Sequence, residues 1–357
     1  MQPAHAPLSR ETRVWVLLDE IFGHRNQSLG VAEALGLPFE TRDIAYSGLS
    51  RLPNALRGAS LLGVAPRARE GLRPPWPDLV IAAGRRLAPL ARFIKRQGGG
   101  RPFLVQIMYP GHGAGEFDLI AAPRHDECRP RANLIETTGA PNRVSAAKLA
   151  DEAKRWRDRF KDLPGPHIAL LVGGATRHRR FDAGLAAELG RRGSALARAA
   201  GGTLLVSTSR RTGRRATQAL ASAIDVPAHI HRWEEGGENP YYGFLGLSDA
   251  VIVTGDSMSM CSEACATGRP VYIFAPPGIV KPAFARLHQE LFDLGMARPL
   301  GESFEQWTYP PLYAATAIAG EIRRRLDLAQ AGAPASNALP PAPARPPEDE
   351  VQKKHDK

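Results

Sequence analysis

Cysteine is scarce in this sequence, with Cys128, Cys261 and Cys265 the only thiols among 357 residues. Three thiols so spaced cannot build a disulfide framework, which favours a reducing compartment. Long apolar runs are also lacking: the first residues have no apolar signal-peptide core, and the run at 14–18 is far too short to cross a bilayer. We therefore expect a cytoplasmic protein whose membrane contact, if it has any, is peripheral and on the inner membrane.

A second group of absences concerns chemistry. No GxGxxG follows the first apolar run and no GxxxxGK[ST] occurs, which argues against dinucleotide oxidoreduction and P-loop hydrolysis. No Asp-x-Asp pair is present to hold a metal-bound diphosphate, so we expect a metal-independent reaction without a cofactor. The pairs His229/His231 and Cys261/Cys265 lack an identifiable third ligand, and packing is a better interpretation of them than a metal site.

Basic residues outnumber acidic ones, 47 Lys and Arg against 36 Asp and Glu, for a net charge of +11. No aromatic-interleaved RNA motif, helix-turn-helix signal or zinc module accompanies this charge, so nucleic acid is not an expected partner. A phosphorylated small molecule or an anionic membrane surface explains the charge at least as well.

Short apolar runs alternate with helical segments along the chain, which is the pattern of parallel, helix-covered sheets. A first series of such runs ends at the breaker DLPGP, and a second series follows it. The sequence therefore predicts an α/β protein with two Rossmann-type domains. The predicted divisions are 1–162 for the first domain, 163–310 for the second, 311–328 for a helix that packs back on the first, and 329–357 for a disordered tail.

The most informative stretch is 250–276, AVIVTGDSMSMCSEACATGRPVYIFAP. It predicts a buried strand, a turn at Asp256, a helix capped by Ser257 or Ser259, and a second strand. In a parallel sheet, ligands bind at the carboxyl ends of the strands, where this turn would lie. Free N–H groups at the helix start can face a phosphate, and Glu263 within the helix can accept both hydroxyls of a ribose.

Seven blocks of the sequence, in order, are similar to those of the mitochondrial-fission ELM family, and the chain resembles a bacterial member of it. The blocks are FGHRNQSLG at 22–30, PDLVIAAGRR at 77–86, FDLIAAPRHD at 117–126, TTGAPNRV at 137–144, LLVGGATRHRRF at 170–181, STSRRT at 207–212 and NPYYGFLGLSDAVIVTGDSMSM from 239. The segment 250–276 also resembles the donor-nucleotide motif of two-domain (GT-B) glycosyltransferases. These resemblances imply a GT-B-like fold, with two Rossmann-type domains facing across a cleft.

Polar residues follow three strands of the second domain, and we expect them to surround a nucleotide-activated sugar. Paired glycines after the strand at 168–172 let the backbone approach a phosphate, and nearby cations can neutralise a departing nucleoside phosphate. The candidate donor-binding residues are Gly173, Gly174, Arg177, Ser207, Ser209, Arg210, Arg211, Asp256, Ser257, Ser259 and Glu263. Simpler roles stay open for them: a basic surface loop, turn and cap residues, or a solvated helix carboxylate.

On the first domain, we expect the loop between the first strand and the first helix to face the acceptor. His24 is the residue there best placed to act as general base, although a loop histidine bonded only to the backbone is an open alternative. The sequence departs from the family pattern at 19–22, where DEIF replaces a small glycine-containing run and changes the shape expected of the loop. The other acceptor-side candidates are Gly23, Asn26, Gln27 and Arg85.

An amphipathic basic stretch of the first domain could contact a membrane. Its leucines and arginines precede Trp76 and are Leu49, Leu52, Leu56, Leu61, Leu62, Arg51, Arg57, Arg67, Arg69 and Arg73. One interpretation is that they hold the domain against an anionic leaflet that carries a lipid-linked acceptor. The other is an ordinary surface helix and loop, with arginine stems covering apolar area.

The leading interpretation is a GT-B-like glycosyltransferase that uses a nucleoside diphosphate or monophosphate sugar for cell-envelope glycan synthesis. Two alternatives stay open. One is a non-catalytic scaffold, as the role of plant family members in organelle division implies, and the other is a nucleotide-sugar epimerase of the non-hydrolysing kind. Nucleotide affinity in the cleft separates the two enzymes from the scaffold.

Overall fold

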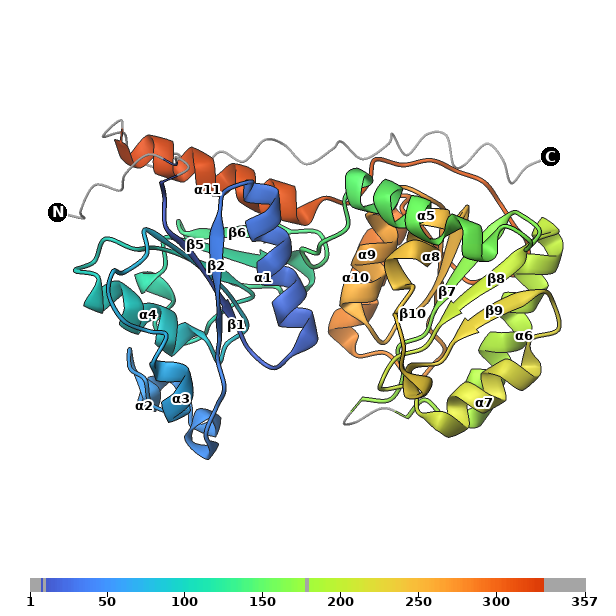
Figure 1. Ribbon diagram of the computed structural model, residues 1–357, viewed down its shortest axis with the longest axis horizontal. Coiled ribbons are helices and arrows are strands. Elements are labelled where there is room, and N and C mark those ends of the chain that lie inside the picture. Colours follow the sequence, from blue (N-terminus) through green and yellow to red (C-terminus); the bar gives the residue numbers. More distant parts are fainter. Residues whose placement is uncertain (1–7, 9–10, 177–179, 331–357) are drawn as a thin grey trace.

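The computed structural model describes residues 8, 11–176 and 180–330. The chain forms two lobes, each built on a six-stranded parallel sheet (Figure 1). The first sheet has the order β2-β1-β3-β4-β5-β6 and consists of β1 (Val14–Leu18), β2 (Phe39–Asp43), β3 (Leu79–Ala83), β4 (Phe103–Ile107), β5 (Leu119–Pro123) and β6 (Leu134–Thr137). The second has the order β12-β11-β10-β7-β8-β9 and consists of β7 (His167–Leu171), β8 (Thr203–Ser207), β9 (Ala228–His231), β10 (Ala250–Thr254), β11 (Val271–Phe274) and β12 (Ala297–Pro299).

These sheets confirm the predicted fold class, a GT-B-like α/β protein with two Rossmann-type units. The central strands are apolar runs with every residue of β1, β3, β4 and β10 buried, as expected of parallel strands covered on both faces. The edge strand β2, sequence FETRD, was not predicted, because four of its five residues are polar and it contains no apolar run.

The helices that cover the two sheets are α1 (Phe22–Leu35), α2 (Asn54–Arg57), α3 (Pro66–Arg69), α4 (Ala88–Gln97), α5 (Ala146–Phe160), α6 (Ala183–Ala200), α7 (Arg214–Ala223), α8 (Tyr241–Leu247), α9 (Met258–Cys265), α10 (Pro282–Asp293) and α11 (Ala314–Gln330). Short 3₁₀ turns are η1 (Gly48–Arg51), η2 (Ala114–Glu116), η3 (Arg124–Asp126) and η4 (Trp233–Glu235). No helix within the described residues is long and apolar enough to span a membrane.

The chain crosses between the lobes before α5, at 138–145, whereas the sequence placed the boundary after residue 162. Helix α5 was assigned to the first domain, but it buries Trp156 and Phe160 in the core of the second. Trp156 lies so close to Gly243 of α8 that a Cβ there would come within 2.4 Å of the indole. The packing of this one helix face therefore decides which lobe α5 belongs to.

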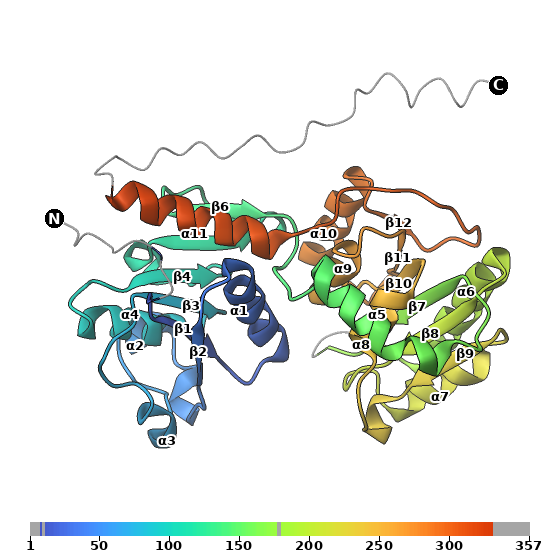
Figure 2. The same cartoon turned by 45° about the horizontal axis from the view of Figure 1, so that its top comes forward.

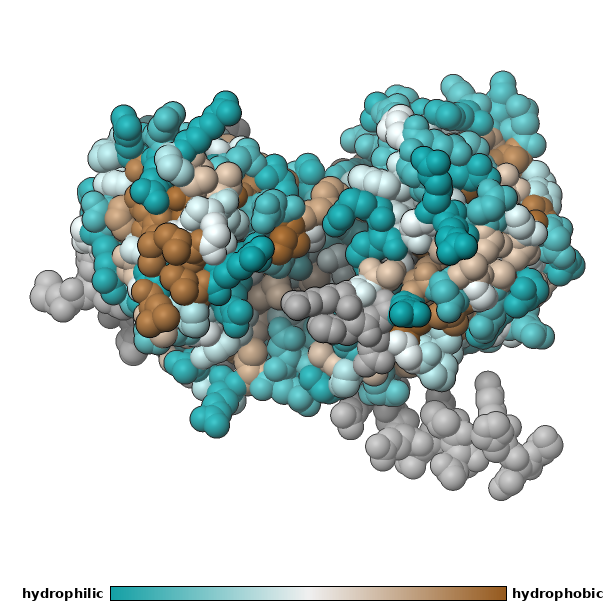
Figure 3. Space-filling model, turned by 90° about the horizontal axis from the view of Figure 1, so that it is seen from below, coloured by the Kyte–Doolittle hydropathy of each residue, from teal (hydrophilic) through white to brown (hydrophobic). Residues whose placement is uncertain are grey.

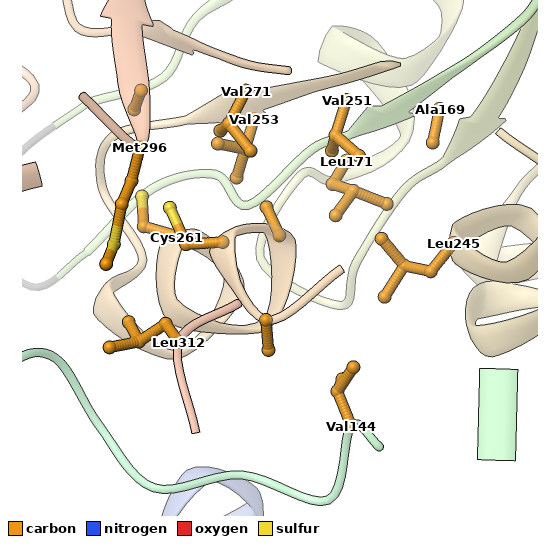
Figure 4. Packing of buried hydrophobic residues seen from close by; sticks show 14 of the residues in the cluster. Val144, Ala169, Leu171, Leu245, Val251, Val253, Cys261, Val271, Met296 and Leu312 are labelled. Carbon is orange, nitrogen blue, oxygen red and sulfur yellow. The ribbon is translucent and has the colours of Figure 1, made fainter. Parts of the chain in front are cut away.

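The chain crosses back ahead of α11, which packs along α1 of the first lobe (Figure 2). Its apolar face contributes Ile318 and Ile322 to the core beneath the first sheet. Figure 4 shows how both crossings are anchored: Val144 and Leu312 lie on the side of α9 away from Val253 and the sheet. Helix α9 is thus packed between the second sheet and both connecting segments.

In each lobe the strand order reverses once, between β1 and β3 in the first sheet and between β7 and β10 in the second. At such a switch point the loops leave the carboxyl ends of the strands in opposite directions and open a crevice for ligands. Figure 3 shows a hollow between the two lobes on the underside of the molecule. The polar loops described next come from these two switch points.

Candidate functional site

On the acceptor side, His24 forms a dyad with Asp19, a residue for which the sequence suggested no role. The Nδ1 atom of His24 lies 2.9 Å from Oδ2 of Asp19, whose side chain is fully buried, while the imidazole is 18 % exposed. Asp19 also accepts the N–H of Ile21 at 3.0 Å through Oδ1. With Nδ1–H donated to the carboxylate, Nε2 of His24 is the nitrogen left to accept a proton.

The same carboxylate contacts the start of α1, which lies earlier than predicted. The sequence predicted that His24 lies in a loop between the first strand and the first helix, but α1 begins at Phe22 and places Gly23 and His24 in its first turn. Asp19 bonds the N–H of Ile21, the residue that precedes the helix, and so takes up a donor at its start. The departure DEIF thus supplies the acid that orients His24.

Gly84, at the end of β3, lies against His24 across the switch point. It has φ +85°, and a Cβ on it would come within 2.5 Å of the imidazole Cε1. Arg85 follows it, exposed in the turn that leads to α4, and its carbonyl accepts a hydrogen bond from Asn54. The glycine therefore leaves room for the histidine, and the predicted acceptor-side arginine lies next to it.

The other two acceptor-side candidates are buried rather than open to a substrate. Asn26 donates from Nδ2 to Oε1 of Glu263 in the opposite lobe, at 3.5 Å. Gln27 is 6 % exposed, and its Oε1 has no hydrogen-bond partner among the described residues. Asn26 therefore joins the lobes in this conformation.

On the donor side, the paired glycines after β7 are held by β10. The N–H of Gly173 donates to Oγ1 of Thr254 at 2.8 Å, and that of Gly174 donates to Oδ2 of Asp256 at 3.0 Å. Gly174 has φ +141°, and a Cβ there would come within 2.3 Å of the Arg211 carbonyl carbon. Both backbone amides therefore donate to groups of the protein itself. Position 174 requires glycine because the loop after β8 approaches it closely.

The anion ligands predicted in the loop after β8 fall into two groups: most are bonded within the protein, and one remains available. Ser209 donates its hydroxyl to the Gly173 carbonyl at 2.5 Å, and Ser207 is 2 % exposed at the end of β8. Arg211 forms an ion pair with Asp256 at 2.6 Å and donates to the Gly174 carbonyl. Arg210 is exposed and pairs with no carboxylate among the described residues, so it is the cation of this loop that remains available.

The start of α9 faces the acceptor side. Ser257 is the N-cap residue by position, but its side chain makes no capping hydrogen bond, contrary to the prediction of a serine cap. The Oγ of Ser259 lies 3.4 Å from where a Cβ on Gly23 would be, which brings the two candidate half-sites into contact. Asp256, in the turn before the helix, is 4 % exposed and one of its oxygens has no described partner.

Glu263 lies at the contact between the lobes. Its side chain is almost fully buried and accepts the hydroxyl of Tyr241 on Oε2 at 2.5 Å and the amide of Asn26 on Oε1. Burial raises the pKa of Glu263 to about 7, although these two hydrogen bonds and the nearby Lys148 ammonium favour the carboxylate. It is therefore not a solvated helix carboxylate, and both of its oxygens are engaged.

Further polar contacts join the lobes beside Glu263. Thr138 donates to Glu290 of α10 at 2.7 Å, and the N–H of Ala140 donates to Ser262 of α9 at 2.9 Å. Candidate Arg177 lies outside the described residues. Within the described ranges, no cluster of three or more His, Cys, Asp or Glu side chains has the arrangement of a metal site.

The two facing Rossmann-type lobes, with polar loops at both switch points, define a GT-B-like protein. More specifically, the chain belongs to the Mitochondrial fission ELM1 family, whose model matches residues 22–326. It is 30 % identical to the mitochondrial fission protein ELM1 of Arabidopsis thaliana over 294 residues, which cover 75 % of this chain and 68 % of that protein. It is 26 % identical over 352 residues to an uncharacterized protein of Rickettsia prowazekii, with 88 % and 99 % of the two chains covered.

Solved structures with a similar fold include UDP-GlcNAc 2-epimerase from Methanocaldococcus jannaschii. It is 12 % identical with a TM-score of 0.48, and the match covers 88 % of this chain and 100 % of that one. Another is the glycosyltransferase SsfS6 of Streptomyces sp. SF2575, complexed with thymidine diphosphate. It is 14 % identical with a TM-score of 0.41, and the match covers 91 % and 97 % of the two chains.

Proposed function

We propose that this protein is a glycosyltransferase that moves a sugar from a nucleotide to an acceptor held by the first lobe. The observation that carries the proposal is the oriented His24–Asp19 dyad at one switch point, placed opposite the start of α9 at the other. A histidine with a buried carboxylate on Nδ1 is arranged to take a proton on Nε2.

In the proposed reaction, Nε2 of His24 accepts the proton of an acceptor hydroxyl as its oxygen bonds to the anomeric carbon. The bond from that carbon to the phosphate oxygen breaks, and the nucleotide leaves with the electron pair. Asp19 keeps the imidazole in the required tautomer and stabilises its charged form. Arg210 and the N–H groups at the start of α9 are the groups that can stabilise the leaving phosphate, without a metal ion.

The other donor-side residues have supporting parts in this proposal. Asp256 fixes Gly174 and Arg211, and Ser209 fixes Gly173, so that the two loops hold one shape. Glu263 accepts the ribose hydroxyls once the hydroxyl of Tyr241 and the amide of Asn26 have left its oxygens. Donor binding then requires the contact between α1 and α9 to loosen.

We further propose a lipid-linked acceptor and a role in cell-envelope glycan synthesis on the cytoplasmic side of the inner membrane. The net charge of +11 supports contact with phosphate-bearing molecules and anionic lipid. A non-catalytic scaffold, which the family name suggests, would have no use for the His24–Asp19 dyad.

Calorimetric titration with UDP, GDP, CMP, ADP and their sugar conjugates tests the donor site. We expect one nucleotide to bind, and binding to weaken about tenfold or more in Arg210→Ser, because one charge-assisted contact to phosphate is lost. Arg191→Ser is the matched control, since Arg191 is an exposed arginine of α6 that, like Arg210, pairs with no carboxylate among the described residues. Glu263→Ala should abolish binding of the same nucleotide.

Slow hydrolysis of the bound nucleotide sugar tests the dyad without knowledge of the acceptor. His24→Gln and Asp19→Asn should each lower this rate while leaving nucleotide affinity unchanged. If no nucleotide or sugar nucleotide binds the intact protein, the transferase and the epimerase both fail and the scaffold takes their place. If the sugar nucleotide is epimerised rather than cleaved, the epimerase interpretation replaces the transferase.

A further inference from the structure

A closed loop on the first lobe presents leucines to solvent and buries the side chains of Ser50, Asn54 and Arg57. We call residues 46–64 the leucine loop. Its ends are joined by an antiparallel bridge between Tyr46 and Val64 and by a hydrogen bond from the N–H of Ser47 to the Gly63 carbonyl at 3.0 Å. Gly63 packs against the backbone of Ser50, where a Cβ would come within 2.7 Å of its nitrogen.

Two buried polar residues of the leucine loop tie it to the rest of the lobe. Asn54 donates to the carbonyls of Arg85 and Pro110 at 2.8 and 3.1 Å. Arg57 is 2 % exposed and donates to the carbonyls of Leu62 and Arg86, each at 3.1 Å. These bonds fix the loop to the turn after β3, the turn that contains Gly84 beside His24.

The leucines of the loop face outward. Their exposed fractions are 52 % for Leu49, 37 % for Leu52, 70 % for Leu56 and 36 % for Leu62, while Leu61 packs inward on the core of the first lobe. Figure 3 shows apolar side chains gathered on the underside of the first lobe, where α2 and α3 lie. Single exposed leucines are ordinary, but four on one loop, beside the buried Asn54 and Arg57, mark a candidate interaction surface.

The charge around the leucines favours an anionic lipid surface as the partner. Residues 44–69 contain no aspartate or glutamate. Arg51, Arg67 and Arg73 are exposed, whereas Arg57 and Arg69 are bonded to backbone carbonyls and are not free for headgroups. No aromatic residue occurs between 47 and 69, although protein–protein interfaces are enriched in aromatic side chains. Exposed leucines beside arginines are the pattern of a surface that lies in a headgroup layer.

We propose that the leucine loop docks on an anionic bilayer, with Leu49, Leu52, Leu56 and Leu62 inserted below the headgroups and the exposed arginines among them. This inference stands on the loop alone and does not need the proposed transfer reaction. If both hold, the bilayer lies beside the turn that carries Gly84, so that a lipid-linked hydroxyl would reach His24 from the membrane.

Vesicle flotation of the full chain tests the proposal. The wild-type protein should bind vesicles that contain phosphatidylglycerol and bind pure phosphatidylcholine vesicles more weakly. Leu49→Ser with Leu56→Ser should weaken binding about tenfold or more. The matched control is Tyr313→Ser, which removes an apolar side chain that is 38 % exposed outside the loop, and it should bind as the wild type does.

A charge variant separates headgroup contact from insertion. Arg51→Ser with Arg67→Ser should weaken binding to phosphatidylglycerol vesicles about tenfold and leave the weaker binding to phosphatidylcholine unchanged. Three outcomes would overturn the proposal: no vesicle binding by the intact protein, equal binding by the leucine variant, or a dimer that the leucine substitutions dissociate. Nucleotide titration of the same variants distinguishes the two proposals, because it should be unaffected by changes in the leucine loop.

Discussion

Replacing Glu263 with glutamine should change how the stability of the protein depends on pH. The carboxyl is buried at the contact between the lobes, and its pKa is raised from 4.5 to about 7, chiefly by burial. In the unfolded chain it titrates near 4.5, so between these two pH values the folded state binds the proton and the unfolded state does not. The free energy of unfolding must therefore fall as pH rises through this window.

The size of the effect follows from the shift. At 1.36 kcal/mol for each pKa unit, a change from 4.5 to about 7 corresponds to about 3 kcal/mol. This stabilisation by the protonated carboxyl is complete below pH 4.5 and is lost above pH 7. Glu263→Gln keeps an uncharged side chain of the same shape at every pH, so relative to the wild type it should gain about 3 kcal/mol between pH 4.5 and 8.

Urea unfolding at a series of pH values, followed by the fluorescence of the tryptophans, measures this difference. Glu302→Gln serves as the matched control, because Glu302 is exposed and its neutralisation should leave the pH profile unchanged. Parallel profiles for the wild type and Glu263→Gln from pH 4.5 to 8 would refute the reasoning. So would a variant that loses stability relative to the wild type as pH rises.

Three further substitutions test the packing around the site. Gly84→Ala requires an unfavourable φ and a clash with His24, and should cost about 1–3 kcal/mol by chemical denaturation while shifting the His24 NMR signals. Gly30→Ala would place a Cβ 2.3 Å from the Asn142 carbonyl oxygen, so thermal melting should show a destabilisation of about 2 kcal/mol or more, although alanine favours a helix. Arg57→Ala leaves buried carbonyls without donors and should lower unfolding free energy by about 2–4 kcal/mol in urea.

The fold could be predicted from the sequence because its central strands are continuous apolar runs separated by helices. The missed strand β2 shows the limit, since FETRD at a sheet edge has no such run. The lobe on which α5 packs could not be predicted either. Its amphipathic pattern fits any apolar surface, and only the close approach of Trp156 to Gly243 selects the second lobe.

The site was predictable in outline for a related reason. Parallel strands place their carboxyl ends at one edge, so the order of the sheet brings Gly174, Arg211 and Asp256 together. What each polar group bonds depends on side-chain contacts that the sequence does not contain. Asp19 shows this most clearly, because its use became evident only from the imidazole that it contacts.

Under the proposed function, Glu263 cannot accept a ribose while the lobes pack around it, because its side chain is almost fully buried. Each of its oxygens accepts one hydrogen bond, from Tyr241 or Asn26, and a buried carboxylate with fewer donors would be less stable still. A ribose can replace those donors, because its two hydroxyls offer the same number of hydrogen bonds. Loss of the bond to Asn26 then loosens the contact between α9 and α1, the helix that carries His24, so the donor site and the general base are linked through one carboxylate.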